Sequence, residues 1–180
     1  VLQDAGSASV FMTLAIESAV LFAFLAAAAY VIHLLSRRGL VSVDSVLETD
    51  KDVTLVNKIL ATVTSAGLIV VLTSLLAQSD DKGQVLASVL VASLVGVIGG
   101  HALFPTRGSV WFWTAPLLAS IFGYAHAAYT ATPSVYLTGL APTNLSRALP
   151  LDFASVGCAG AIFGYWTARR WKHAVEEDES

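Results

Sequence analysis

The sequence predicts an all-α integral membrane protein with five transmembrane helices, an outside N-terminus and a cytoplasmic C-terminus. Of its 180 residues, 56% are hydrophobic and 13% are charged, so too little polar surface remains to cover a water-soluble globule. The apolar residues gather in five runs of about 18 residues or more, which is the length needed to cross a hydrocarbon core about 30 Å thick. We therefore expect a single membrane domain over residues 1–180.

Each predicted helix is delimited by the residues at its ends. The five spans are 9–35, 54–77, 84–104, 110–131 and 151–168. The first stops at Arg37 and Arg38, and the second at the polar turn Asp80-Asp81-Lys82-Gly83. Pro105 closes the third, because proline disfavours helix in the residue before it. The fourth opens with two tryptophans, which suit the headgroup region, and the fifth runs into a basic cluster.

The distribution of basic residues predicts the orientation, because short loops rich in Lys and Arg stay in the cytoplasm. With the N-terminus outside, eight of the ten Lys and Arg residues fall on the inner side, and only Lys82 and Arg147 fall outside. An even number of spans would mix the two sets. We expect a multi-pass protein of a cell membrane or an organelle inner membrane.

Two further segments have a distinct composition. The outer segment 132–150 holds three of the five prolines beside several apolar side chains. Such a stretch forms no single regular helix and is too apolar to be free in water, so we expect it to dock on another part of the protein. Residues 173–180 form an acidic, solvated tail.

Titratable groups inside the hydrocarbon are costly, so each one is a candidate functional residue. Glu17 lies about 12 Å below the outer end of the first helix at 1.5 Å per residue, and its carboxyl is expected to be protonated or to have a specific partner. His126 lies at a similar depth, with Tyr129 and Asp152 on the same side. These four residues form the candidate intramembrane polar site, while Asp152 also fits an ordinary charge in the first turn of a helix.

His33 and His101 both lie in the last inner turn of their helices. Two histidines that face each other at one depth are what axial ligation of a b-type haem requires. The alternative is that each imidazole reaches the membrane interface, since His33 is next to an arginine pair and His101 precedes a proline. Haem b is the one cofactor that the sequence suggests, and no metal site is predicted.

Small residues four apart let helices approach closely in lipid. They occur in the last three predicted helices, at Gly96, Gly100, Gly123, Gly160 and Gly164. We interpret them as packing positions within the bundle, with contact to another subunit as the alternative.

No motif of a soluble enzyme is present and no catalytic residue is predicted. The net charge of −3 offers nucleic acid no basic face. The sequence favours an accessory subunit that packs against and positions other chains of a multisubunit membrane complex, with bound membrane lipids. The alternatives are a proton-coupled or ion-conducting transporter that uses Glu17, and a haem and quinone redox subunit that uses His33 and His101.

Overall fold

The computed structural model describes residues 8–37, 54–106, 108–130 and 143–178, and every regular element in these ranges is helical. The elements are α1 (Ala8–Arg37), α2 (Leu55–Leu76), α3 (Lys82–Leu103), α4 (Val110–Trp113), α5 (Ala115–Thr130), the 3-10 helix η1 (Asn144–Arg147), α7 (Pro150–Asp152), the π-helix η2 (Phe153–Gly157) and α8 (Cys158–Asp178). The predicted all-helical fold is confirmed for the described residues. Residues 132–142 of the predicted outer segment and 179–180 of the tail lie outside them.

In the described ranges, three helices are long and apolar enough to cross a membrane: α2, α3 and the Ala8–Ile32 part of α1. Their ends follow the polar residues in the sequence. Thr54 caps α2 by accepting a hydrogen bond from the Asn57 backbone N–H, and the Asp81 carboxylate caps α3 in the same way at Gln84, with a distance of 3.0 Å. These caps occupy N–H groups that have no partner within the helix.

The predicted fourth and fifth helices differ from continuous α-helices. The run 110–131 is broken at Thr114, because Pro116 has no N–H to continue the hydrogen-bond ladder to Phe112; the Thr114 N–H bonds that carbonyl instead. The last run continues from Pro150 through η2 to Asp178, past the predicted end at 168. The acidic tail up to residue 178 therefore belongs to a helix.

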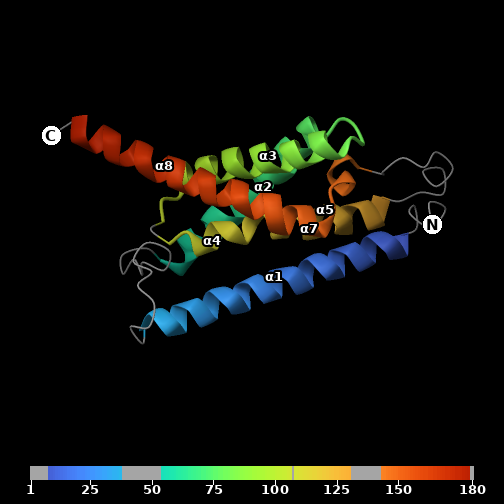
Figure 1. The fold of residues 1–180 in the computed structure, drawn as a ribbon, viewed down its shortest axis with the longest axis horizontal. Coiled ribbons are helices and arrows are strands. Elements are labelled where there is room, and N and C mark those ends of the chain that lie inside the picture. Colours follow the sequence, from blue (N-terminus) through green and yellow to red (C-terminus); the bar gives the residue numbers. More distant parts are fainter. Residues whose placement is uncertain (1–7, 38–53, 107, 131–142, 179–180) are drawn as a thin grey trace.

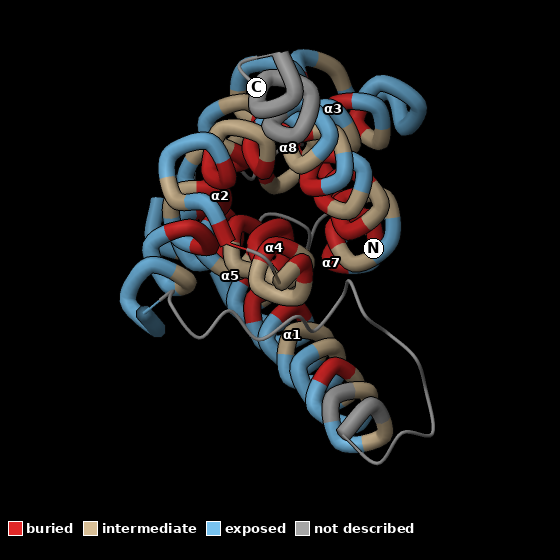
Figure 2. The backbone as a smooth tube through the Cα atoms, turned by 90° about the vertical axis from the view of Figure 1, so that its left-hand side faces the viewer, coloured by how far each residue is buried: buried red, intermediate tan, exposed pale blue. Residues whose placement is uncertain are grey.

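The helices form a bundle with α1 at its edge (Figure 1). α2 and α3 form an antiparallel hairpin, α8 packs on α3, and α5 lies between α2 and α1. Buried residues concentrate where α2, α3, α4, α5 and α8 face one another, whereas most of α1 is exposed or half-buried (Figure 2). One core cluster joins α3, α5 and η2 through Val89, Leu117 and Phe153.

The predicted packing glycines lie at close contacts inside this bundle. A Cβ atom on Gly160 would clash with the carbonyl oxygen of Leu90 in α3, and one on Gly164 with that of Leu94. The other three predicted glycines contact α2 and the 3-10 helix, at Gly96 against Ile69, Gly100 against Ser65, and Gly123 against Leu145. Gly99, which was not predicted, lies against Leu68. Absence of a side chain at these positions lets backbones approach closely, as is common between membrane helices.

Candidate functional site

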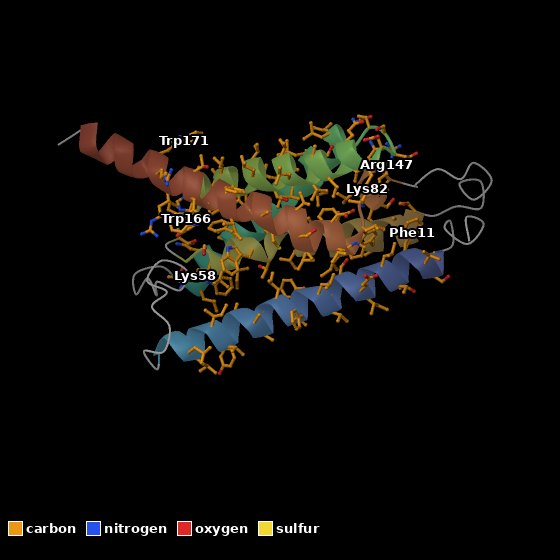
Figure 3. The ribbon with its side chains drawn as sticks, viewed as in Figure 1. Phe11, Lys58, Lys82, Arg147, Trp166 and Trp171 are labelled. Carbon is orange, nitrogen blue, oxygen red and sulfur yellow. The ribbon has the colours of Figure 1, made fainter. Side chains whose placement is uncertain are left out.

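The basic side chains labelled in Figure 3 lie at the two ends of the bundle. Lys82 and Arg147 lie at the end that also holds Phe11, and Lys58 and Trp166 lie toward the opposite end (Figure 3). At the first of these ends, residues 143–152 cover the α2–α3 turn. We call η1 and α7, with the two residues between them and Thr143, the docked segment, and its contacts form the most extensive polar site in the described part of the chain.

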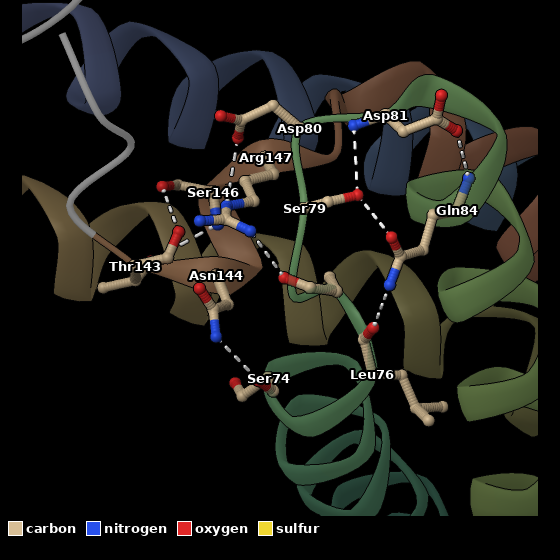
Figure 4. Close-up of polar contacts among 11 residues, drawn as sticks. Ser74, Leu76, Ser79, Asp80, Asp81, Gln84, Thr143, Asn144, Ser146 and Arg147 are labelled. Carbon is tan, nitrogen blue, oxygen red and sulfur yellow. Dashed lines mark hydrogen bonds and ion pairs between the residues drawn. The ribbon is translucent and has the colours of Figure 1, made fainter.

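The first half of the docked segment binds the C-terminal end of α2. The Asn144 side chain donates a hydrogen bond to the Ser74 carbonyl at 3.0 Å, and Arg147 donates one to the Ala77 carbonyl at 3.0 Å (Figure 4). Arg147 also pairs with Asp80 at 3.1 Å. The last carbonyls of a helix have no partner within it, and a cation there is stabilised by the helix dipole. These side chains therefore complete the end of α2.

Asp152 makes the second set of contacts. Its carboxylate accepts the Leu149 backbone N–H at 2.7 Å and pairs with Lys82 at 2.5 Å. Asp152 is the third residue of a helix that begins with Pro150, and an acidic side chain at that position commonly bonds the residue just before the helix. One carboxylate thus joins the start of α7 to the start of α3.

Helix α5 also contacts the docked segment. The buried Tyr124 hydroxyl donates a hydrogen bond to the Ala148 carbonyl. Leu145 is buried against Gly123 and belongs to the core cluster that α3, α5 and the last helical run share. Residues 143–150, the described part of the segment 132–150, thus pack on α2 and α5.

The four residues of the predicted intramembrane site have different surroundings. Asp152 is 8% exposed and lies in the network described above, in the first turn of its helix. His126 is exposed and stacks on Phe122, with ring centroids 6.1 Å apart, and Tyr129 is 91% exposed. In the described part of the chain, no hydrogen bond joins any two of these four residues. The structure brings Lys82 to Asp152 instead, and Tyr124 to the Ala148 carbonyl.

Glu17 lies on the outside of α1. The residues of α1 that face the bundle are Phe11, Ala15, Ser18 and Ala29, which are buried, with Leu21, Phe22 and Leu25 packed against the core between them. Glu17 is exposed, about 120° around the helix from the middle of this seam at 100° per residue. Phe11 and Ala15 share a core cluster with Tyr124, so Glu17, two residues after Ala15, belongs to the end of the bundle that carries the docked segment.

The two predicted haem ligands lie on helices that the fold separates. The His101 ring is buried between Phe112 and Tyr165, with centroids 5.8 Å and 5.5 Å away. His33 lies in α1, and its side chain is outside the described part of the structure. Figures 1 and 2 both place α1 and α3 on opposite sides of α4 and α5. Shared haem ligation therefore stays a prediction that this arrangement does not favour.

A small pocket of about 190 Å³ opens between α2, α5 and the docked segment. Its lining is Val70, Ser74, Phe122, Gly123, His126, Thr143 and Leu145. Among the described residues, no three His, Cys, Asp or Glu side chains gather as a metal ion would require.

Sequence reasoning missed Lys82, Tyr124 and Arg147 as members of the polar site. A signal was present for two of them, because Lys82 and Arg147 are the only basic residues that the charge count leaves on the outer side. Both are engaged in ion pairs with the acidic residues at that end. Tyr124 carries no such signal, since its role depends on a carbonyl 24 residues away.

No model of a protein family, no curated protein and no solved structure matches this chain.

Proposed function

We propose that this chain crosses the membrane five times with its N-terminus outside, and that it serves as an accessory subunit of a multisubunit complex in a cell membrane or organelle inner membrane. Its work in this proposal is to pack against other membrane chains and to position them. Lipids would cover the apolar faces that no partner covers.

The five crossings are supported by length and by charge. α1, α2 and α3 are each long enough. α4 and α5 together, and the run from α7 to α8, extend over two further predicted spans. The basic side chains labelled in Figure 3, Lys58, Lys82 and Arg147, lie at the ends of the bundle. Eight of the ten Lys and Arg residues fall on one side of the five predicted spans, the side where Lys58 lies.

The observation that carries the accessory role is the attachment of α1. This helix packs through a single seam, mainly on α5, and of the three long apolar helices its spanning window is the least buried. In lipid, burial of apolar area gives helices no drive to associate, so a helix held by one side has its opposite face available to another chain.

The position of the polar groups supports the same role. Asp152, Tyr124 and Arg147 all hold the chain's own elements together. Glu17 faces away from the bundle, whereas the carboxyl of an ion carrier would face an interior path. The placement of Glu17 therefore favours an accessory subunit over a transporter.

Native mass spectrometry after extraction from the source membrane in a mild detergent tests this function. We expect the chain together with other membrane chains at a fixed stoichiometry, and loss of those chains in a harsh detergent as the control. Recovery of the chain as a monomer in the mild detergent would contradict the accessory role.

A further inference from the structure

One charged residue interrupts the outward face of α1. Thr13, Glu17, Val20 and Phe24 follow one another at spacings of four, three and four residues, and all four are exposed. This spacing places them along one side of the helix. Glu17 is the only Asp, Glu, Lys or Arg between Ala8 and Ile32. The face is thus an apolar stripe with a single carboxyl in it.

The described part of this chain supplies no base to that carboxyl. No hydrogen bond or ion pair joins Glu17 to another described residue, and the basic side chains at its end of the bundle have other contacts. His126 stacks on Phe122. Lys82 pairs with Asp152, and Arg147 pairs with Asp80. A carboxyl in hydrocarbon is costly unless it is paired, and intramembrane acidic residues almost always face a protein interior or another helix.

The shape of the same face admits a close neighbour. Ala27 is exposed and continues the stripe three residues after Phe24, and a small residue there lets a second helix approach the backbone. Phe24, one turn before Ala27 on the stripe, is 74% exposed and offers a large apolar contact. Charge and shape together specify an occupant that is helical, apolar and positively charged at one position.

Resting on the proposed function, we propose that the face of α1 around Glu17 docks a transmembrane helix of a partner subunit, and that this helix presents a lysine or arginine to the Glu17 carboxylate. A lipid surface would leave the carboxyl unpaired. A second copy of this chain would place two like carboxyls together, which is unfavourable unless one is protonated.

The test measures association of the intact, purified chain with synthetic host helices in phosphatidylcholine vesicles by energy transfer. One host is polyleucine, and the others carry a single Lys or a single Glu at the depth of Glu17. We expect the Lys host to bind about tenfold more tightly than the polyleucine host, because two buried opposite charges satisfy each other. Equal binding of the Lys and polyleucine hosts would overturn the proposal.

Two variants attribute the preference to one residue. Glu17→Gln keeps the shape and removes the charge, so it should abolish the preference for Lys, and Thr13→Val, one turn away on the same stripe, should leave it intact. Both positions are exposed, and circular dichroism checks that both variants fold. A preference for Lys that survives Glu17→Gln would refute the assignment. Energy transfer between two labelled copies of this chain that Glu17→Gln alters would favour a homodimer instead.

The proposal and the function on which it rests fail differently. If native mass spectrometry finds partner chains but the Lys host binds no better than polyleucine, the docking surface is wrong and the accessory role stands. If the Lys host is preferred but the chain is a monomer in its own membrane, the accessory role is wrong and the chemistry of the surface stands.

Discussion

Replacement of Asp152 by alanine should lower the free energy of unfolding by about 2–3 kcal/mol, whereas Lys82→Ala should lower it by about 1 kcal/mol. The Asp152 carboxylate is buried and accepts the Leu149 N–H at 2.7 Å, and a hydrogen bond to a charged group contributes about 1.5–3 kcal/mol. The side chain of Lys82 is 55% exposed, so water screens the ion pair and its contribution is about 0–1 kcal/mol. The backbone hydrogen bond therefore dominates the effect.

Unfolding of the purified protein in detergent micelles, followed by tryptophan fluorescence, measures both changes. Asp80→Ala is the matched control, because Asp80 is an acidic residue at the same end of the bundle whose side chain is 66% exposed. We expect a loss of about 0.5 kcal/mol or less for this variant. If Lys82→Ala destabilises the protein as much as Asp152→Ala, the ion pair and not the cap holds the docked segment, and the reasoning is refuted.

Three further outcomes follow from the packing and from the proposed topology. Gly160→Ala should destabilise the bundle by about 1–3 kcal/mol, because its Cβ would meet a backbone carbonyl of α3, while Gly67→Ala, with no atom within 4 Å, should stabilise α2 by about 0.5–1 kcal/mol in the same unfolding assay. Tyr124→Phe removes one buried hydrogen bond and should cost about 1 kcal/mol; no change would mean that the hydroxyl does not anchor the docked segment. In a variant of the chain without Cys158, Asp80→Cys should react with a membrane-impermeant maleimide added to sealed cells. If this cysteine reacts only after the cells are opened, the proposed orientation is reversed.

The positions of α1, α2 and α3 could be predicted from the sequence to within a few residues. Each is an apolar run between charged or capping residues, and both signals act locally along the chain. The break at Thr114 was harder to predict from the sequence. Pro116 fits either the first turn of a helix or a kink within one, and only the structure shows that a separate helix begins beside it.

The candidate site was predicted less well than the fold. Sequence position gives the depth of a residue along a helix, and Glu17, His126 and Asp152 do lie in the half of the protein that carries the docked segment. The side of the helix on which a residue lies is a separate quantity, which depends on how the helix is rotated about its axis. α1 is apolar on nearly every face, so its sequence contains little contrast to show which side meets α5, and the outward direction of Glu17 could not be read from it.

Composition, run length and charge placement were enough to establish an all-helical chain with apolar segments of membrane-spanning length, because transfer of a segment into hydrocarbon depends on its summed residues and not on its neighbours. Only the tertiary structure decided that Asp152 meets Lys82 and that Arg147 reaches the end of α2, each across 70 residues of chain. Such pairs depend on the directions in which packed helices turn their side chains, and that is a property of the assembled bundle rather than of any single segment.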